Sequence, residues 1–276
     1  MSLLPGRVFV SPLLLALVGV GCERASKATE TASTATALRE RTATRFASAD
    51  FLKPLMDGSA KLDPYLAPLI YLESPHDAPL GVPRVDADGE LTVDGSRPTV
   101  YYADRLVELE GRERRQITYV WFRETRAPRA QGVRLTFDHD GFPVITEVLD
   151  DESGHRILYV TRGLEDEAET SFGRPLPGRT FAIENAPDGE ADVVLAGSIS
   201  GAPAPMGPYV YQARDAYDIT TVHCRCSPTQ ADDIREMIEY ELLPLGMLAG
   251  VWPAEGQPDF APPGFPARRL RLPPSF

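Results

Sequence analysis

The chain is poor in the residues that most often build metal and nucleic-acid sites. Its 276 residues include three cysteines and four histidines, so few side chains can serve as soft metal ligands. Lys and Arg together number 28 against 40 for Asp and Glu, which gives a formal net charge of −12. Binding to nucleic-acid phosphates requires a basic surface. The acidic balance therefore excludes nucleic acid from the expected partners.

Several sequence motifs of enzymes are also missing. The chain has no Walker loop, no G-x-G-x-x-G and no H-E-x-x-H. The stretch 197–201 is not a nucleophile elbow, because its central residue is Ile199 rather than Ser. Asp86–Gly89 and Asp138–Gly141 look like pieces of calcium loops but lack the closing Glu, so we interpret both as turns between strands. These absences favour a non-enzymatic binding or structural module.

The N-terminus has the pattern of a processing signal. Arg7 precedes an apolar run from Val8 to Val20, which is shorter than a bilayer-spanning helix requires. Residues 17–22 read LVGVGC. This ending resembles the lipobox of bacterial lipoproteins, although Gly19 stands where the family usually has Leu. The resemblance covers only the first two dozen residues, and the alternative is an ordinary signal peptide that happens to end near a cysteine.

The lipoprotein resemblance carries its own expectations. It implies that residues 1–21 are a signal peptide and that the cleaved chain is acylated on Cys22. Several acyl chains on one residue would give stable membrane anchoring, whereas one chain alone binds marginally. Glu23 rather than Asp follows the cysteine, which by the same analogy favours the outer membrane, with the protein facing the periplasm.

Composition divides the rest of the chain into three parts. Residues 22–36 are rich in Ala, Ser and Thr and predict a flexible tether. Residues 37–250 are long enough for a single globular domain, and their start, at 38–57, is predicted to be helical in part. Residues 251–276 are rich in proline, which excludes regular structure. This extension either wraps the domain, using its apolar side chains as pegs, or hangs free.

Most of the domain has the pattern of short strands and tight turns. A hairpin is predicted within 106–122, and residues from about 116 to 161 predict a four-stranded antiparallel meander. Leu164–Phe172 has helical spacing and is expected to end at Gly173. A further hairpin is expected from 179–184 and 192–200.

One amphipathic helix is predicted near the C-terminal end of the domain. The sequence Ser-Pro-Thr-Gln at 227–230 has the form of a capping box with proline at the first helical position. Ile234, Met237, Ile238 and Leu242 then recur at helical spacing. The sequence therefore predicts an α+β fold, in which a mostly antiparallel sheet is covered by a helix over 228–243 and followed by the proline-rich tail.

The motif Cys224-Arg225-Cys226 is the main chemical candidate. If the strand predicted before it continues, Cys224 and Cys226 share one face, while His223 and Arg225 share the other. The two thiols can form a disulfide, bind a soft ion such as Cu(I) or Zn(II), or include a reactive thiol. The alternative is a purely structural role, in which both cysteines are small buried residues without reactive chemistry. No other cofactor is expected.

These inferences combine into one functional hypothesis. The chain is expected to be a lipid-anchored envelope protein whose domain binds an unknown protein or small molecule, with the membrane as its second partner. The alternative is a thiol-redox or soft-metal protein that uses Cys224 and Cys226, together with His223.

Overall fold

The computed structural model describes residues 40–58, 61–74, 80–123, 129–149, 156–185, 193–214, 218–249, 251 and 270–276. The chain separates into two compact units, Met1–Arg41 and Thr42–Phe276, and the second is described here. The predicted signal peptide and tether lie outside the described residues. Within the described part, no helix is both long enough and apolar enough to cross a membrane.

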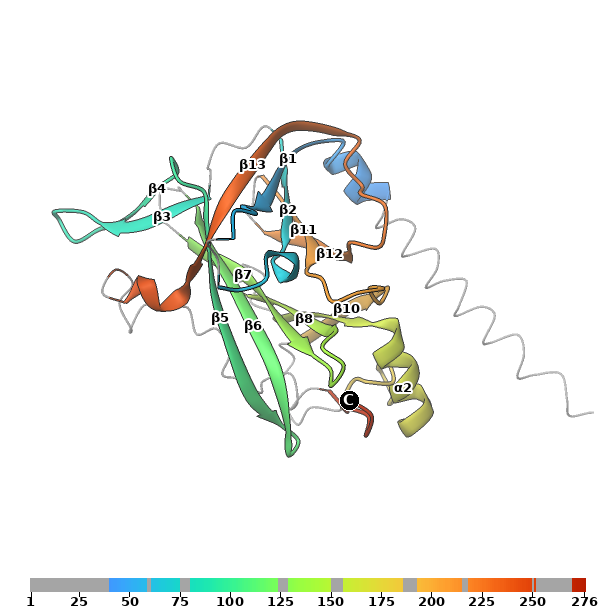
Figure 1. Ribbon diagram of the computed structural model, residues 1–276. Coiled ribbons are helices and arrows are strands. Elements are labelled where there is room, and N and C mark those ends of the chain that lie inside the picture. Colours follow the sequence, from blue (N-terminus) through green and yellow to red (C-terminus); the bar gives the residue numbers. More distant parts are fainter. Residues whose placement is uncertain are drawn as a thin grey trace, which may run out of the picture. The chain divides into compact units, whose positions relative to one another are not determined.

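The second unit is built mainly from strands (Figure 1). They are β1 (Ser48–Pro54), β2 (Leu69–Glu73), β3 (Leu80–Val85), β4 (Leu91–Asp94), β5 (Thr99–Leu109), β6 (Arg112–Arg123), β7 (Arg129–Phe137), β8 (Pro143–Leu149), β9 (Arg156–Thr161), β10 (Val193–Ile199), β11 (Pro208–Gln212), β12 (Ile219–Cys224) and β13 (Asp233–Pro244). The helical elements are η1 (Pro64–Leu66), α2 (Arg162–Phe172) and η2 (Leu245–Leu248).

The strands form one mixed sheet in the order β10-β9-β8-β7-β6-β5-β13-β1-β2-β11-β12, and β3 pairs with β4 and β6 beside this path. The predicted meander is confirmed, because β6, β7, β8 and β9 pair antiparallel in sequence order. Strand β13 instead lies parallel to both of its neighbours, β1 and β5. The α+β prediction was therefore wrong, since the unit is mostly β.

The predicted helix over 228–243 is strand β13. Its second half alternates with a period of two, so that Ile238, Tyr240 and Leu242 face the core. Two members of the supposed helical stripe are exposed instead, Ile234 by 37% and Met237 by 60%. The apolar residues fit both periods over so short a segment, and pairing with β1 and β5 on both sides decides in favour of the strand.

The expected capping box is also absent. The N–H of Gln230 donates to the Tyr211 hydroxyl at 3.0 Å rather than closing a box with Ser227. The N–H of Ser227 donates to the carbonyl of Cys224 at 3.0 Å, which closes a turn. The four residues therefore belong to the loop between β12 and β13.

Other local predictions have mixed outcomes. The short helix is confirmed as α2 with Gly173 at its C-cap, and Gly89 and Gly141 adopt positive φ in the two expected turns. Of the segment predicted to be partly helical, residues 40–45 are helical among the described residues, and β1 follows from Ser48. The hairpin from 179–184 and 192–200 was wrong, because β10 pairs parallel with β9.

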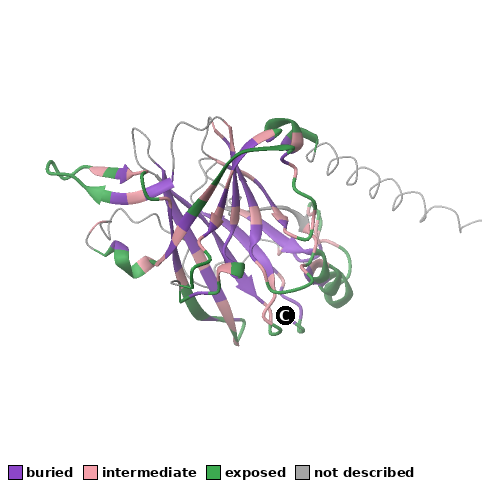
Figure 2. Ribbon diagram, turned by 45° about the horizontal axis from the view of Figure 1, so that its top comes forward, coloured by how far each residue is buried: buried purple, intermediate pink, exposed green. Residues whose placement is uncertain are grey.

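The sheet coils around a shared apolar interior (Figure 2). Side chains from both halves of the strand path meet there, including Leu52, Ile70, Trp121, Val210 and Tyr240. The segment with η1 adds Leu62 and Leu66 to this core. At the two ends of the path, β10 and β12 approach each other, and the Cys226 sulfur lies 3.5 Å from the carbonyl oxygen of Gly201.

A second apolar cluster lies on the outer face. Helix α2 packs there with Leu164 and Ala168, beside Leu270, Leu272 and Phe276 of the C-terminal segment. Of the two alternatives open for the extension, residues 270–276 adopt the one in which apolar side chains hold the tail on the domain. Residues 252–269 of the predicted extension lie outside the described part.

Candidate functional site

The Cys224-Arg225-Cys226 motif lies where β12 ends. The strand stops at Cys224, and Arg225 and Cys226 form the turn that follows. The two sulfurs are joined in a disulfide, with the Cα atoms 5.2 Å apart, which is an ordinary separation for such a bond. The N–H of Cys226 donates to the Cys224 sulfur at 3.1 Å. Cys224 is buried and Cys226 is exposed.

Ending the strand changes the predicted orientation of the motif. His223 still belongs to β12, where it pairs with Tyr209 of β11 and contacts the ring of Tyr211, with the ring centroids 5.5 Å apart. Its Nε2 lies 3.3 Å from the side-chain nitrogen of Gln230. Arg225, by contrast, turns toward the segment around η1 and donates from Nη2 to the carbonyl of Ala67. His223 and Arg225 therefore do not share one face of the strand, contrary to the prediction from the sequence.

The described residues offer little to complete a metal centre at this motif. No group of three His, Cys, Asp or Glu side chains lies close enough together within them to hold a metal ion. In the disulfide form, Cys224 and Cys226 carry no thiolate to bind a soft ion. Copper or zinc binding would therefore require prior reduction of this bond.

Two buried tyrosines, Tyr119 and Tyr240, lie in the cluster next to Arg225, and nothing in the sequence distinguishes them from other strand residues. The hydroxyl of Tyr240 donates to the carbonyl of Pro68 at 2.6 Å, next to the carbonyl that Arg225 binds. The Tyr119 side chain is fully buried, and its hydroxyl has no hydrogen-bond partner among the described residues. Burial raises the pKa of both phenols, and the positive charge of Arg225 opposes that rise.

Backbone geometry fixes the segment that Arg225 and Tyr240 hold. The N–H of Gly207 donates to the carbonyl of Tyr65 at 2.9 Å. A Cβ atom at Gly207 would overlap the carbonyl oxygens of Leu66 and Ala67, so the position requires glycine. The segment of η1 is therefore fastened from three directions, by Gly207, Arg225 and Tyr240.

A second candidate is the β3–β4 hairpin, which projects from the sheet as an arm (Figures 1 and 2). Only Leu80 and Gly81 of β3 pair with β6, whereas Val82–Val85 pair with β4. Val93 anchors the base of the arm in a cluster with residues of β5, β6 and η2. The tip residues 84–90 are exposed.

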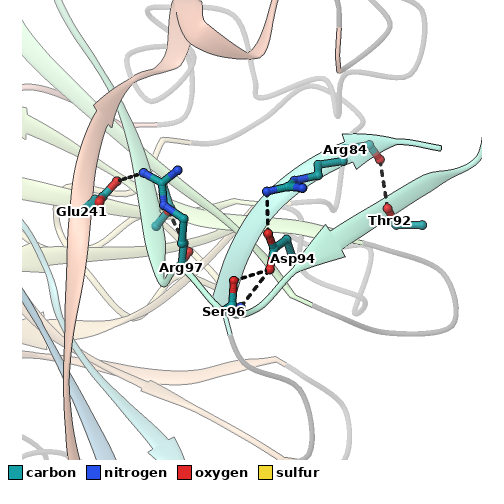
Figure 3. Close-up of polar contacts among 7 residues, drawn as sticks. Arg84, Thr92, Asp94, Ser96, Arg97 and Glu241 are labelled. Atoms are coloured by element: carbon teal, nitrogen blue, oxygen red, sulfur yellow. Dashed lines mark hydrogen bonds and ion pairs between the residues drawn. The ribbon is translucent and has the colours of Figure 1, made fainter.

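A polar clamp, formed by Arg84, Asp94, Ser96, Arg97 and Glu241, lies at the base of this arm (Figure 3). The carboxylate of Asp94 accepts from the hydroxyl of Ser96 at 2.6 Å and pairs with Arg84 at 2.6 Å. Hydrogen bonds from the hydroxyl and from the backbone N–H of Ser96 lower the pKa of Asp94 below its usual value, and the charge of Arg84 contributes. Arg97 then pairs with Glu241 of β13 at 2.9 Å. The clamp connects the arm to the main sheet.

Comparison with known proteins supplies no family for this chain: no family model, no curated protein and no solved structure matches it.

Proposed function

We propose that this chain is a lipid-anchored protein of the cell envelope that binds a partner protein through the β3–β4 arm. The exposed arm is the observation that carries the proposal. The lipobox-like sequence ending at Cys22 supports the anchor. Pairing of the other two cysteines, Cys224 and Cys226, supports export, because disulfides persist in oxidising compartments.

The construction of the arm favours a protein partner. An isolated two-stranded hairpin is marginally stable in water, yet here the outer half extends beyond the packed base formed around Val93. Strand β4 pairs only with β3 among the described strands. The arm therefore offers unpaired backbone N–H and C=O groups along an edge, which an extended segment of another protein can pair with.

Metabolic labelling tests the anchor. Cells that produce the chain and receive labelled palmitate should incorporate the label into the protein, and Cys22→Ala should abolish incorporation. The Cys224→Ser variant is the matched control and should remain labelled. Labelling that survives Cys22→Ala would refute the lipid anchor without bearing on the arm.

Site-specific photo-crosslinking in intact cells tests the arm. A crosslinking residue placed at Val85, which is 46% exposed, should give a discrete adduct of higher mass. The same residue at Leu106, which is 64% exposed on β5, should not. Excess wild-type chain should suppress the adduct, whereas a chain with residues 84–92 replaced by a tight turn should not. Equal adducts from both positions would contradict the proposal.

A second candidate function is thiol–disulfide exchange at Cys224 and Cys226. The exposure of Cys226 favours it, because an attacking thiolate must reach one sulfur of the bond. An external dithiol would be oxidised as the protein disulfide becomes two thiols. Thiol trapping should then show protection from maleimide in untreated envelopes and modification of both cysteines after mild dithiol treatment. A bond that resists mild dithiol treatment of the folded protein would exclude this function.

A further inference from the structure

Arg225 is a largely buried cation for which the described residues provide no counter-ion. Its Nη2 donates to the backbone carbonyl of Ala67, and its Nε has no hydrogen-bond partner. None of the ion pairs within the described ranges includes Arg225. Burial lowers the pKa of this guanidinium. A guanidinium removed from water is costly unless a negative group or further hydrogen bonds replace its hydration.

A second unpartnered donor lies beside it. Tyr119 of β6 is 0% exposed, and within the described part of the chain its hydroxyl makes no hydrogen bond. Tyr119 packs in the same buried cluster as Ala67, whose carbonyl accepts from Arg225, and as Tyr240. The charge of Arg225 accordingly acts on the pKa of Tyr119. The neighbouring Tyr240 hydroxyl is already engaged with Pro68. One N–H and one O–H donor therefore remain unused in the same buried region.

We propose that Arg225 and Tyr119 form a binding site for a small oxyanion, namely a carboxylate of the size of formate or acetate. The guanidinium offers charge and an N–H, and the phenol offers a neutral donor, which together match the two oxygens of a carboxylate. Tyr119 belongs to the same buried apolar cluster as Leu62 and Leu66, so the site favours a small ligand with little polar surface.

The position of Arg225 gives a small carboxylate access to the site from solvent. Arg225 is the middle residue of the ring closed by Cys224 and Cys226, and it retains partial exposure. Cys226 and the nearby Gly201 are exposed. The disulfide also restricts the backbone on both sides of Arg225, which reduces the entropy that the guanidinium would lose on binding. This site is independent of the proposed β3–β4 arm.

Titration of the full chain in detergent with sodium formate or acetate tests the site, with sodium chloride at equal ionic strength as reference. Binding is measured by calorimetry and by the near-ultraviolet difference spectrum of tyrosine. Arg225→Gln should weaken binding about tenfold or more, because it removes a charged hydrogen bond. Tyr119→Phe should weaken it roughly threefold, because it removes a neutral one.

Arg115→Gln is the matched control, because this second arginine also influences Tyr119 but is paired with Asp104 at 2.8 Å. Its carboxylate affinity should equal that of the wild type. Tyr119→Phe keeps the shape of the side chain, so it tests the site even where Arg225→Gln does not fold. Absence of formate and acetate binding to the wild-type chain would overturn the proposal. Unchanged affinity in Tyr119→Phe would do the same, and inorganic phosphate should bind more weakly because it is bulkier.

Discussion

The two hairpins β5–β6 and β3–β4 leave the sheet in different ways (Figure 1). The far end of β5–β6 is covered, because Val107 and Leu109 pack against Leu270 and Phe276 of the C-terminal segment. Arg112 of the same hairpin donates to the carbonyls of Pro273 and Pro274 and to Phe276. The β3–β4 arm has no such cover among the described residues, and its tip is exposed.

The difference shows how one kind of element can serve stability or be left free for contact. Both hairpins have regular antiparallel pairing and a tight turn with glycine at positive φ, Gly111 in one and Gly89 in the other. Local structure therefore does not distinguish them. The distinction comes from a segment more than 160 residues further along the chain that covers one hairpin only.

The largest expected effect is a difference in lost stability between a substitution in the buried hairpin and one in the exposed arm. Leu109→Ala removes methyl groups from a site that is 1% exposed and should lower the free energy of unfolding by roughly 2 to 5 kcal/mol. Val85→Ala at the tip of the arm should change it by less than about 0.5 kcal/mol. Urea unfolding followed by circular dichroism measures both. Comparable losses would mean that the arm is packed in solution.

A second prediction concerns the base of the arm. A Cβ atom at Gly81 would overlap the carbonyl oxygen of Asp94, so Gly81→Ala should cost about 1 to 3 kcal/mol and disturb pairing between β3 and β4. Gly89→Ala is the control, since open space surrounds that position and only its φ of 85° opposes alanine. It should cost roughly 1 kcal/mol. If Gly81→Ala proves harmless, the close approach at the base does not exist in solution.

The outcome for β13 shows why the sequence predicted some elements and not others. In the β6–β9 meander, turn residues and alternating apolar residues specify each hairpin locally, and pairing joins neighbours in sequence. Strand β13 instead pairs with β1 and β5, which lie far away in the chain. A spacing that fits two periods cannot choose between helix and strand without knowledge of those partners.

The candidate sites were predictable to different degrees. Cys224 and Cys226 were singled out because their close spacing limits the chemistry that they can perform. Tyr119 and Tyr240 look like ordinary strand residues, and only the approach of the η1 segment turns them into a buried polar group beside Arg225. Such groupings depend on long-range topology, which sequence periodicity does not encode.

A third prediction concerns the contact between the covered β5–β6 hairpin and the C-terminal segment 270–276. Arg112→Met should remove the hydrogen bonds to the backbone of 273–276 and cost about 1 to 2 kcal/mol. Hydrogen exchange measured by mass spectrometry should then show faster exchange in 270–276 and at the tip of β5–β6. Arg105→Met on the exposed side of β5 is the control and should leave both regions protected. Protection that survives Arg112→Met would show that the remaining contacts, namely the apolar packing and the hydrogen bonds of Arg114, Arg271 and Ser275, suffice to hold the segment.

The smallest expected effect is a pH dependence confined to the base of the free arm. The pKa of Asp94 is lowered in the folded protein, first by its hydrogen bonds from Ser96 and then by Arg84. The clamp is therefore fully formed above the unfolded-state pKa of about 3.9 and is lost as the pH falls through the lower, folded-state value.

The amide signal of Ser96 in heteronuclear NMR should report this titration, with a midpoint below the usual Asp value. Ser96→Ala removes the hydroxyl that makes the largest contribution and should move the midpoint upward. The amide of Gly111, in the turn of the covered hairpin, should not follow the same midpoint. A midpoint for Ser96 at or above the usual Asp value would mean that the hydrogen bonds from Ser96 to Asp94 do not persist in solution.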